Sequence, residues 1–165
     1  MNQLYAEAGV KRKDTSKTMV LRSLLILGIV FGVFLLMFGS YLGIIGVILI
    51  AAMVFLFPKL NVEYEYVFVD GQIDFDRITA KSRRKTLLRI DLEQVEIMAP
   101  EGSHALDSYN HIQLEKKDFS SGDKTVKPYV IIANKEEKKY RISFEPSEKM
   151  LEMMKQKSPR KITLY

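Results

Sequence analysis

The chain changes character after residue 57, from one continuous apolar stretch to short alternating runs. Residues 23–57 contain no charged residue and no Asn, Gln or His over 35 positions. A helix needs about 20 apolar residues to cross a hydrocarbon core, and a single helix of this length would reach about 52 Å, which is too long. Two helices over residues 18–38 and 42–57 fit better, with a turn at residues 39–43, where two glycines and a serine cluster. The sequence therefore predicts a two-helix transmembrane hairpin over residues 18–58.

Basic residues flank this stretch on both sides, and none lies between the two predicted helices. Those nearest to it are Lys11, Arg12, Lys13, Lys17, Arg22 and Lys59. Because lysine and arginine stay on the cytoplasmic side, we expect a multi-pass cell-membrane protein with both termini in the cytoplasm. A cleaved signal peptide is the competing interpretation, but its apolar core spans only about 7–15 residues.

Small residues recur within the apolar stretch. Gly28 and Gly32 are four positions apart, a spacing that lets two membrane helices approach closely. They are candidate helix-packing positions, either within the hairpin or between chains, unless they reflect only the general frequency of glycine in membrane helices.

From residue 59 onward, apolar positions recur at every second residue. Such short runs predict strands over residues 62–69, 72–78, 86–91, 94–99, 110–119 and 139–144, and the fully apolar run at residues 129–133 predicts a buried strand. Asp70-Gly71 predicts a tight hairpin between the first two, because glycine tolerates positive φ. Met150, Leu151 and Met154 then recur at helical spacing and predict a helix to about residue 157. The chain thus divides into a basic cytoplasmic arm (1–17), the hairpin (18–58), a β-rich domain (59–158) and a basic tail (159–165).

About seven antiparallel strands followed by one helix resemble the bacterial pleckstrin-homology (PH)-like domain. The resemblance rests on the opening hairpin, the basic turn before TLLRIDLEQVEIM and the closing YRISFEPSEKMLEMM. With EAGVKRKDTS near the start, the whole chain is similar to a family of small membrane proteins of Gram-positive bacteria whose function is unknown. The resemblance implies a membrane α-helical hairpin joined to a mainly β (α+β) domain, a bent sheet or barrel capped by a C-terminal helix. It brings no activity and no catalytic residues.

The residues form no recognisable catalytic or metal site. Cysteine is absent, which excludes disulfides and thiolate chemistry. His104 and His111 lie near Asp107 on an expected loop, whereas a metal site needs three or four converging ligands. Asp74 and Asp76 fall on the strand face that alternation predicts to be solvated, and paired-acid chemistry needs a cleft. We therefore expect a protein that is not an enzyme and has no cofactor and no metal.

Little of the net charge of +5 lies in the β-rich part, because residues 59–165 carry 20 basic and 18 acidic side chains. Such a balance does not favour nucleic-acid binding. The local exception is a basic loop with its neighbours, whose candidate contacts to an anionic surface are Arg77, Lys81, Arg83, Arg84, Lys85 and Arg89. Near an anionic leaflet each cation contributes about 1 kcal/mol. A solvated turn that only satisfies the cytoplasmic charge bias is the alternative, and the sequence leaves both open.

Together these features predict a membrane-anchored, non-enzymatic binding or scaffold module. Its cytoplasmic PH-like domain would face a protein, a peptide or an anionic lipid surface. The chain itself would be integral to the membrane through its two helices, and its partner there would be another protein or a further copy of the chain. The alternative is an accessory subunit of a membrane transporter or membrane enzyme complex that acts through its transmembrane helices.

Overall fold

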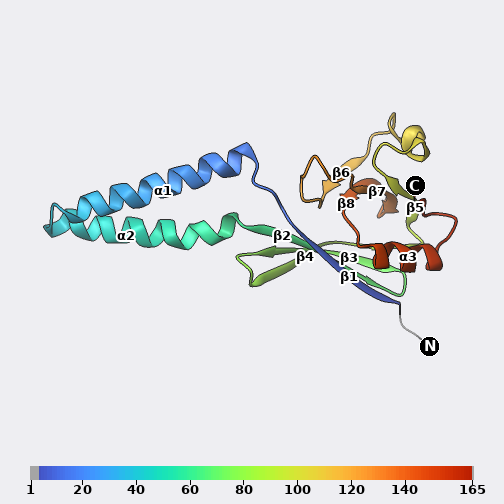
Figure 1. Cartoon of the computed structure of the whole chain (residues 1–165), viewed down its shortest axis with the longest axis horizontal. Helices are drawn as coiled ribbons and strands as arrows, with labels where there is room; N and C mark the ends of the chain where they lie inside the picture. Colours follow the sequence, from blue (N-terminus) through green and yellow to red (C-terminus); the bar gives the residue numbers. More distant parts are fainter. Residues whose placement is uncertain (1–3, 165) are drawn as a thin grey trace. The chain divides into compact units, whose positions relative to one another are not determined.

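The computed structural model describes residues 4–164 and divides them into two compact units (Figure 1). One unit holds the helical hairpin, residues 13–62, together with residues 79–83. The other holds most of the β-strands and the C-terminal helix.

The helical unit is built from two antiparallel helices, α1 (Ser16–Leu36) and α2 (Ser40–Leu56). Gly39 sits in the turn between them at a φ of +61°, which favours glycine. The 3-10 helix η1 (Phe57–Leu60) follows α2 and contains Pro58. Both helical spans are long and apolar enough to cross a membrane, so the two predicted helices are confirmed.

Glycines bring α1 and α2 into close contact. A Cβ on Gly32 would lie 2.6 Å from Cγ1 of Ile50, and a Cβ on Gly46 would lie 2.6 Å from the carbonyl oxygen of Gly32. A Cβ on Gly28 would meet the side chain of Met53 at 3.3 Å. Both candidate packing glycines of α1 therefore face α2 of the same hairpin, and larger side chains there would force the helices apart.

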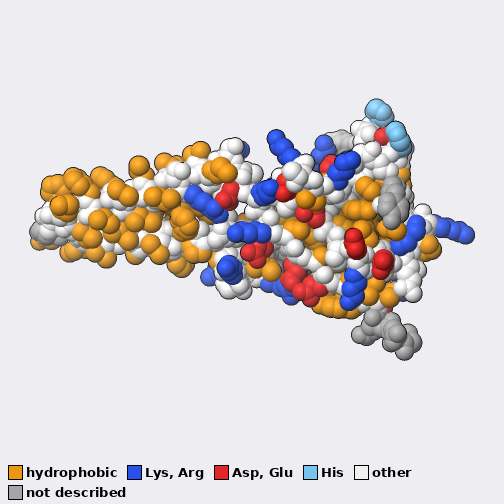
Figure 2. All heavy atoms as spheres, in the orientation of Figure 1, with side chains coloured by type: hydrophobic (Ala, Val, Ile, Leu, Met, Phe, Trp, Pro, Cys, Tyr) orange, Lys and Arg blue, Asp and Glu red, His pale blue; other side chains and the backbone are white. Residues whose placement is uncertain are grey.

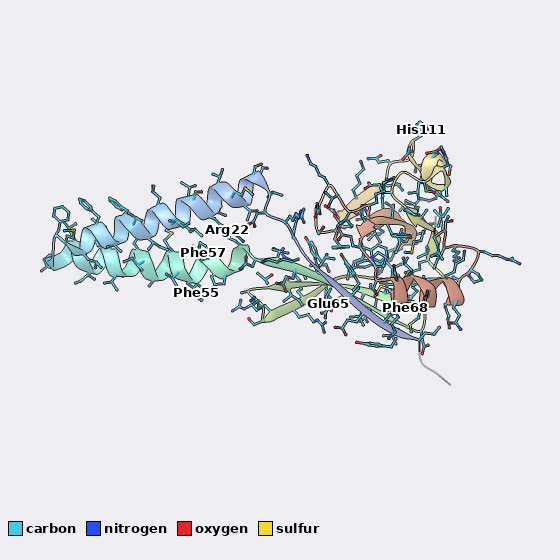
Figure 3. All side chains as sticks on the ribbon, in the orientation of Figure 1. Arg22, Phe55, Phe57, Glu65, Phe68 and His111 are labelled. Atoms are coloured by element: carbon cyan, nitrogen blue, oxygen red, sulfur yellow. The ribbon has the colours of Figure 1, made fainter. Side chains whose placement is uncertain are left out.

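The Arg22 side chain joins the two ends of the hairpin (Figure 3). From the second turn of α1 it donates one hydrogen bond to the carboxylate of Asp14, which precedes α1. Its Nη2 donates another to Oδ1 of Asn61, which follows η1, at 2.7 Å. A charge at the edge of an apolar segment is costly unless it is paired. Here the Arg22 guanidinium is paired with polar side chains at both ends of the helical hairpin.

The described residues of the β-rich part form two four-stranded sheets. The first has the order β1-β2-β3-β4, with β1 (Tyr5–Lys11), β2 (Val62–Val69), β3 (Gln72–Thr79) and β4 (Arg83–Asp91). The second has the order β5-β7-β8-β6, with β5 (Val95–Pro100), β7 (Tyr129–Lys135), β8 (Lys138–Phe144) and β6 (Glu115–Asp118). The 3-10 helix η2 (His104–Tyr109) lies between β5 and β6 in the chain, and α3 (Glu148–Lys157) follows β8.

Aromatic side chains from both sheets meet in the core. The ring of Tyr66 from β2 packs edge to face on Phe144 from β8, with centroids 5.4 Å apart. Phe75 of β3 stacks on Phe119 at 4.9 Å, and Met150 and Met154 of α3 are fully buried. The Tyr66 hydroxyl donates to the carbonyl oxygen of Phe119, and burial raises the pKa of Tyr66.

The predicted fold is confirmed in outline, and the structure adds one strand at its start. Residues 5–11 form strand β1 instead of lying in a basic arm over residues 1–17. This strand pairs antiparallel with β2 from Tyr5 opposite Val69 to Lys11 opposite Glu63. The apolar helical hairpin is therefore inserted between two neighbouring strands of one sheet.

Two further segments differ from their predictions. Arg83–Asp91 is all strand, so the basic loop shrinks to a turn at residues 80–82. The strand predicted over residues 110–119 is shorter, because β6 covers only Glu115–Asp118 and pairs with β8 in parallel. The C-terminal tail contacts the second sheet, since Ile162 is 1% exposed and bridges to Met98.

Replacing Gly46 with leucine is predicted to separate α1 from α2. The new side chain would collide with the backbone of Gly32, and such overpacking costs roughly 1–3 kcal/mol. The measurement is disulfide formation in detergent micelles between cysteines placed at Gly28 and Met53, whose yield should fall in the Gly46→Leu background. Gly43→Leu is the matched control, since a Cβ there meets nothing within 4 Å. Equal yields in both backgrounds would contradict this packing.

Candidate functional site on the β3–β4 hairpin

The candidate cations on β3, β4 and their turn fall into a paired and an unpaired group. Arg89 belongs to the paired group, because its Nε and Nη2 each donate to the carboxylate of Asp74 at 2.6 Å. This bidentate hydrogen bonding to Asp74 raises the pKa of Arg89. Its charge is therefore already balanced on the sheet.

Arg84 is the second paired cation, and it forms ion pairs with two carboxylates. Its Nε lies 3.2 Å from Oδ2 of Asp76, and its Nη2 contacts Glu65. The two-residue turn at Asp70 and Gly71 places Glu65 of β2 opposite Asp76 of β3, so the two acids share one guanidinium.

Asp76 is buried, against the prediction that Asp74 and Asp76 lie together on a solvated face. Its side chain is 7% exposed, whereas that of Asp74 is 21% exposed. Alternation places both on the same face, but Asp76 is covered because Glu65 stands beside it and Arg84 reaches over both. Oδ1 of Asp76 has no hydrogen-bond partner among the described residues, so this acid depends on the Arg84 charge.

The unpaired group is concentrated at the end of the hairpin. Its members are exposed and make no ion pair or side-chain hydrogen bond within residues 4–164; they are Arg77, Lys81, Arg83 and Lys85. Residues 83–87 of β4 are all exposed, so no second layer covers either face of the strand there. Residues 79–83 group with the helical hairpin in one compact unit. Of the four unpaired cations, Lys81 and Arg83 lie in that unit, whereas Arg77 and Lys85 belong to the unit that holds most of the β-strands.

Other candidate chemistry is dispersed. Nδ1 of His104 lies 3.1 Å from the carboxylate of Asp107, and both side chains are exposed. His111 is exposed on the loop after η2 (Figure 3). Within the part of the chain that the structure describes, no three His, Asp or Glu residues converge as a metal site would require.

Sequence reasoning missed two features of this region. It did not separate paired from unpaired cations, because the partners of Arg84 lie on other strands. It also missed the burial of Asp76, which depends on its cross-strand neighbour. The Asp70-Gly71 turn was the available signal, since it fixes the register that sets Glu65 opposite Asp76.

Two four-stranded sheets with a C-terminal helix define a PH-like domain, here with an apolar helical hairpin between its first two strands. The chain belongs to the family described as Bacterial PH-like domain (DUF6106), whose model matches residues 2–164. The match includes β1 and the helices as well as the sheets, which confirms the resemblance drawn from the sequence. Comparison with curated proteins gives no match, and neither does comparison with solved structures.

Removing Arg84 is predicted to destabilise the sheet more than removing Arg89. Arg84→Gln leaves two facing carboxylates without their countercharge, which should cost about 1–3 kcal/mol of unfolding free energy. Arg89→Gln breaks a more exposed pair and should cost about 0–1 kcal/mol. Denaturant unfolding of the full chain in micelles, followed by tyrosine circular dichroism, measures both.

The double variant Arg84→Gln, Asp76→Asn should recover part of the lost stability, because it removes one of the two uncompensated charges. Equal losses for the two arginines, or no recovery in the double variant, would show that Arg84 does not neutralise this acid pair.

Proposed function

We propose that this protein is a membrane-anchored, non-enzymatic binding module. Its helical hairpin holds the PH-like domain at the cytoplasmic face of the cell membrane, where the unpaired cations of the β3–β4 hairpin contact anionic headgroups. The observation that carries the proposal is the insertion of an apolar hairpin between two paired strands, β1 and β2.

The surface of the helices supports an anchor in lipid. Only 11% and 6% of the two apolar helical windows is buried, whereas the core helix of a soluble protein is mostly covered. Large side chains such as Leu27, Ile48 and Phe55 are 64–68% exposed, and Figure 2 shows apolar side chains over the visible face of both helices. Soluble monomers rarely expose apolar patches beyond a few hundred Å². Lipid chains solvate such a surface at no cost.

The connections between the hairpin and the sheet are short. Residues 12–15 separate β1 from α1, and Asn61 alone separates η1 from β2. Four extended residues reach at most about 14 Å. Once the helices span the bilayer, both tethers hold the first sheet close to the headgroups.

The charges at the base of the hairpin support a cytoplasmic domain. Lys17 precedes the apolar part of α1, and Lys59 follows α2, with its ammonium 4.2 Å from the ring centre of Phe55. The turn between the helices carries no charge. Positive charges at the base and none in the turn support an orientation with the base inside the cell.

The chemistry of the unpaired cations favours phosphate-bearing lipid. Each contributes about 1 kcal/mol of attraction near an anionic surface, and this attraction is screened by salt. Arg84 and Arg89 are excluded from the contact because carboxylates already neutralise them. Four free cations on one hairpin are enough to orient the domain, without any pocket that recognises a particular headgroup.

A fluorophore on Ser82 is predicted to report this contact. Because the chain has no native cysteine, Ser82→Cys can be labelled with an environment-sensitive dye in the full chain reconstituted into lipid nanodiscs. Its emission should shift to the blue in phosphatidylglycerol-rich discs relative to phosphatidylcholine discs. About 1 M salt, which shortens the Debye length to about 3 Å, should abolish the difference.

Charge reversal identifies the residues responsible. Lys81→Glu with Arg83→Glu should remove the lipid-dependent shift. Lys124→Glu with Lys127→Glu is the matched control, since it makes the same charge change at exposed positions between β6 and β7 and should leave the shift intact. The headgroup contact is disproved if both pairs behave alike or if emission is the same in both lipids.

A further inference from the structure

The free edge of β5 is occupied by the chain's own C-terminal segment. In the second sheet β5 pairs with β7 on one side only. On its other side, the amide of Met98 donates to the carbonyl of Lys161, and the amide of Thr163 donates to the carbonyl of Met98, both at 2.8 Å. Residues 161–163 thus add to the sheet as a short parallel strand, near the end marked C in Figure 1.

Side chains around this edge hold the added segment at four points, one of which is the ammonium of Lys155 in α3, which donates to the carbonyl oxygen of Ile162. Ile162 is 1% exposed and fills an apolar position beside β5. The ammonium of Lys161 donates to the carbonyl oxygens of Leu92 and Glu93, each at 2.9 Å. The Tyr129 hydroxyl donates to the carbonyl of Leu164 at 2.8 Å.

Charged side chains surround a depression beside this edge. Lys161 and Lys157 line this depression of about 600 Å³ together with the acidic side chains Asp70, Asp91 and Glu93. The site therefore combines backbone hydrogen bonds, one apolar position and an acidic rim. These features select an extended segment with a cationic residue followed by an aliphatic one.

Little of the fold has to open to vacate this edge. One residue bridge carries both backbone hydrogen bonds. Releasing it leaves the pairing of β5 with β7 and of β7 with β8 intact. A segment held by a single residue bridge opens locally, without global unfolding.

We propose that the β5 edge is an exchangeable docking site for an extended cationic–aliphatic segment of a partner protein, which the C-terminal segment occupies in its absence. A partner would bind by strand addition, with Met98 supplying the backbone contacts. This inference does not depend on the lipid contact of the β3–β4 hairpin, because it concerns the other sheet.

The test uses the full chain truncated after Pro159, in detergent micelles, with a synthetic peptide of residues 160–164 as the probe. The peptide should cause saturable NMR shifts in β5 amides, with a Kd on the order of 1 mM or tighter. The untruncated chain should respond at least about tenfold more weakly, since its own segment competes at a high effective concentration. A peptide carrying Ile162→Asp should not bind. A folded truncated chain without saturable shifts, or equal binding of the two peptides, overturns the proposal.

Hydrogen exchange on the intact chain decides the question if truncation prevents folding. The amides of Met98 and Thr163 should exchange at least about tenfold faster than those of the β7–β8 ladder, because the segment detaches locally. Exchange as slow as in β7 and β8 would mean that the segment leaves only on global unfolding, which also overturns the proposal.

Discussion

The pairing of β1 with β2 is the interaction on which the rest of the structure depends. These strands flank the helical hairpin in the chain, and Lys11 at the end of β1 lies opposite Glu63 near the start of β2. Closing a flexible loop of this length would cost about 3–4 kcal/mol. The helices remove most of that cost, because they pack on each other and Arg22 joins Asp14 to Asn61 at their base. The apolar hairpin and the sheet thus stabilise each other through two short connections.

Electrostatic pairing assigns the cations of the first sheet to different roles. Arg84 and Arg89 neutralise carboxylates on neighbouring strands and so belong to the folded structure. The exposed, unpaired residues at the end of the β3–β4 hairpin are available to contact another surface. The division follows from strand register, because the acids that face β4 accept only the cations within their reach. Net charge alone does not reveal this division.

Strong local signals predicted most of the elements. The apolar stretch gave two helices, and Asp70-Gly71 gave a turn in which both residues have positive φ, as a two-residue hairpin requires. Ser147 caps α3 by accepting from the amide of Met150, in the first turn of the predicted helix. These features are determined by residues close together in the sequence, so local sequence patterns predict them.

The missed features depend on contacts between distant segments. Strand β1 contains alanine and glycine and lacks the β-branched density of β2, so only its pairing with β2 makes it a strand. Residues 161–163 are too few to show any period, yet they complete an edge of β5. At the candidate site, the six cations were found from sequence, whereas their separation into two groups required the positions of Glu65, Asp74 and Asp76.

The central claim is that the hairpin spans the membrane and places the PH-like domain inside the cell. Labelling of single cysteines in intact cells with an impermeant maleimide tests it most directly. Tyr41, 81% exposed beside the turn between the helices, and Ser108, exposed in η2, are suitable positions. The account predicts that Tyr41→Cys is labelled in intact cells and that Ser108→Cys is labelled only after permeabilisation. Labelling of Ser108→Cys in intact cells, or recovery of the protein in the soluble fraction, would contradict it.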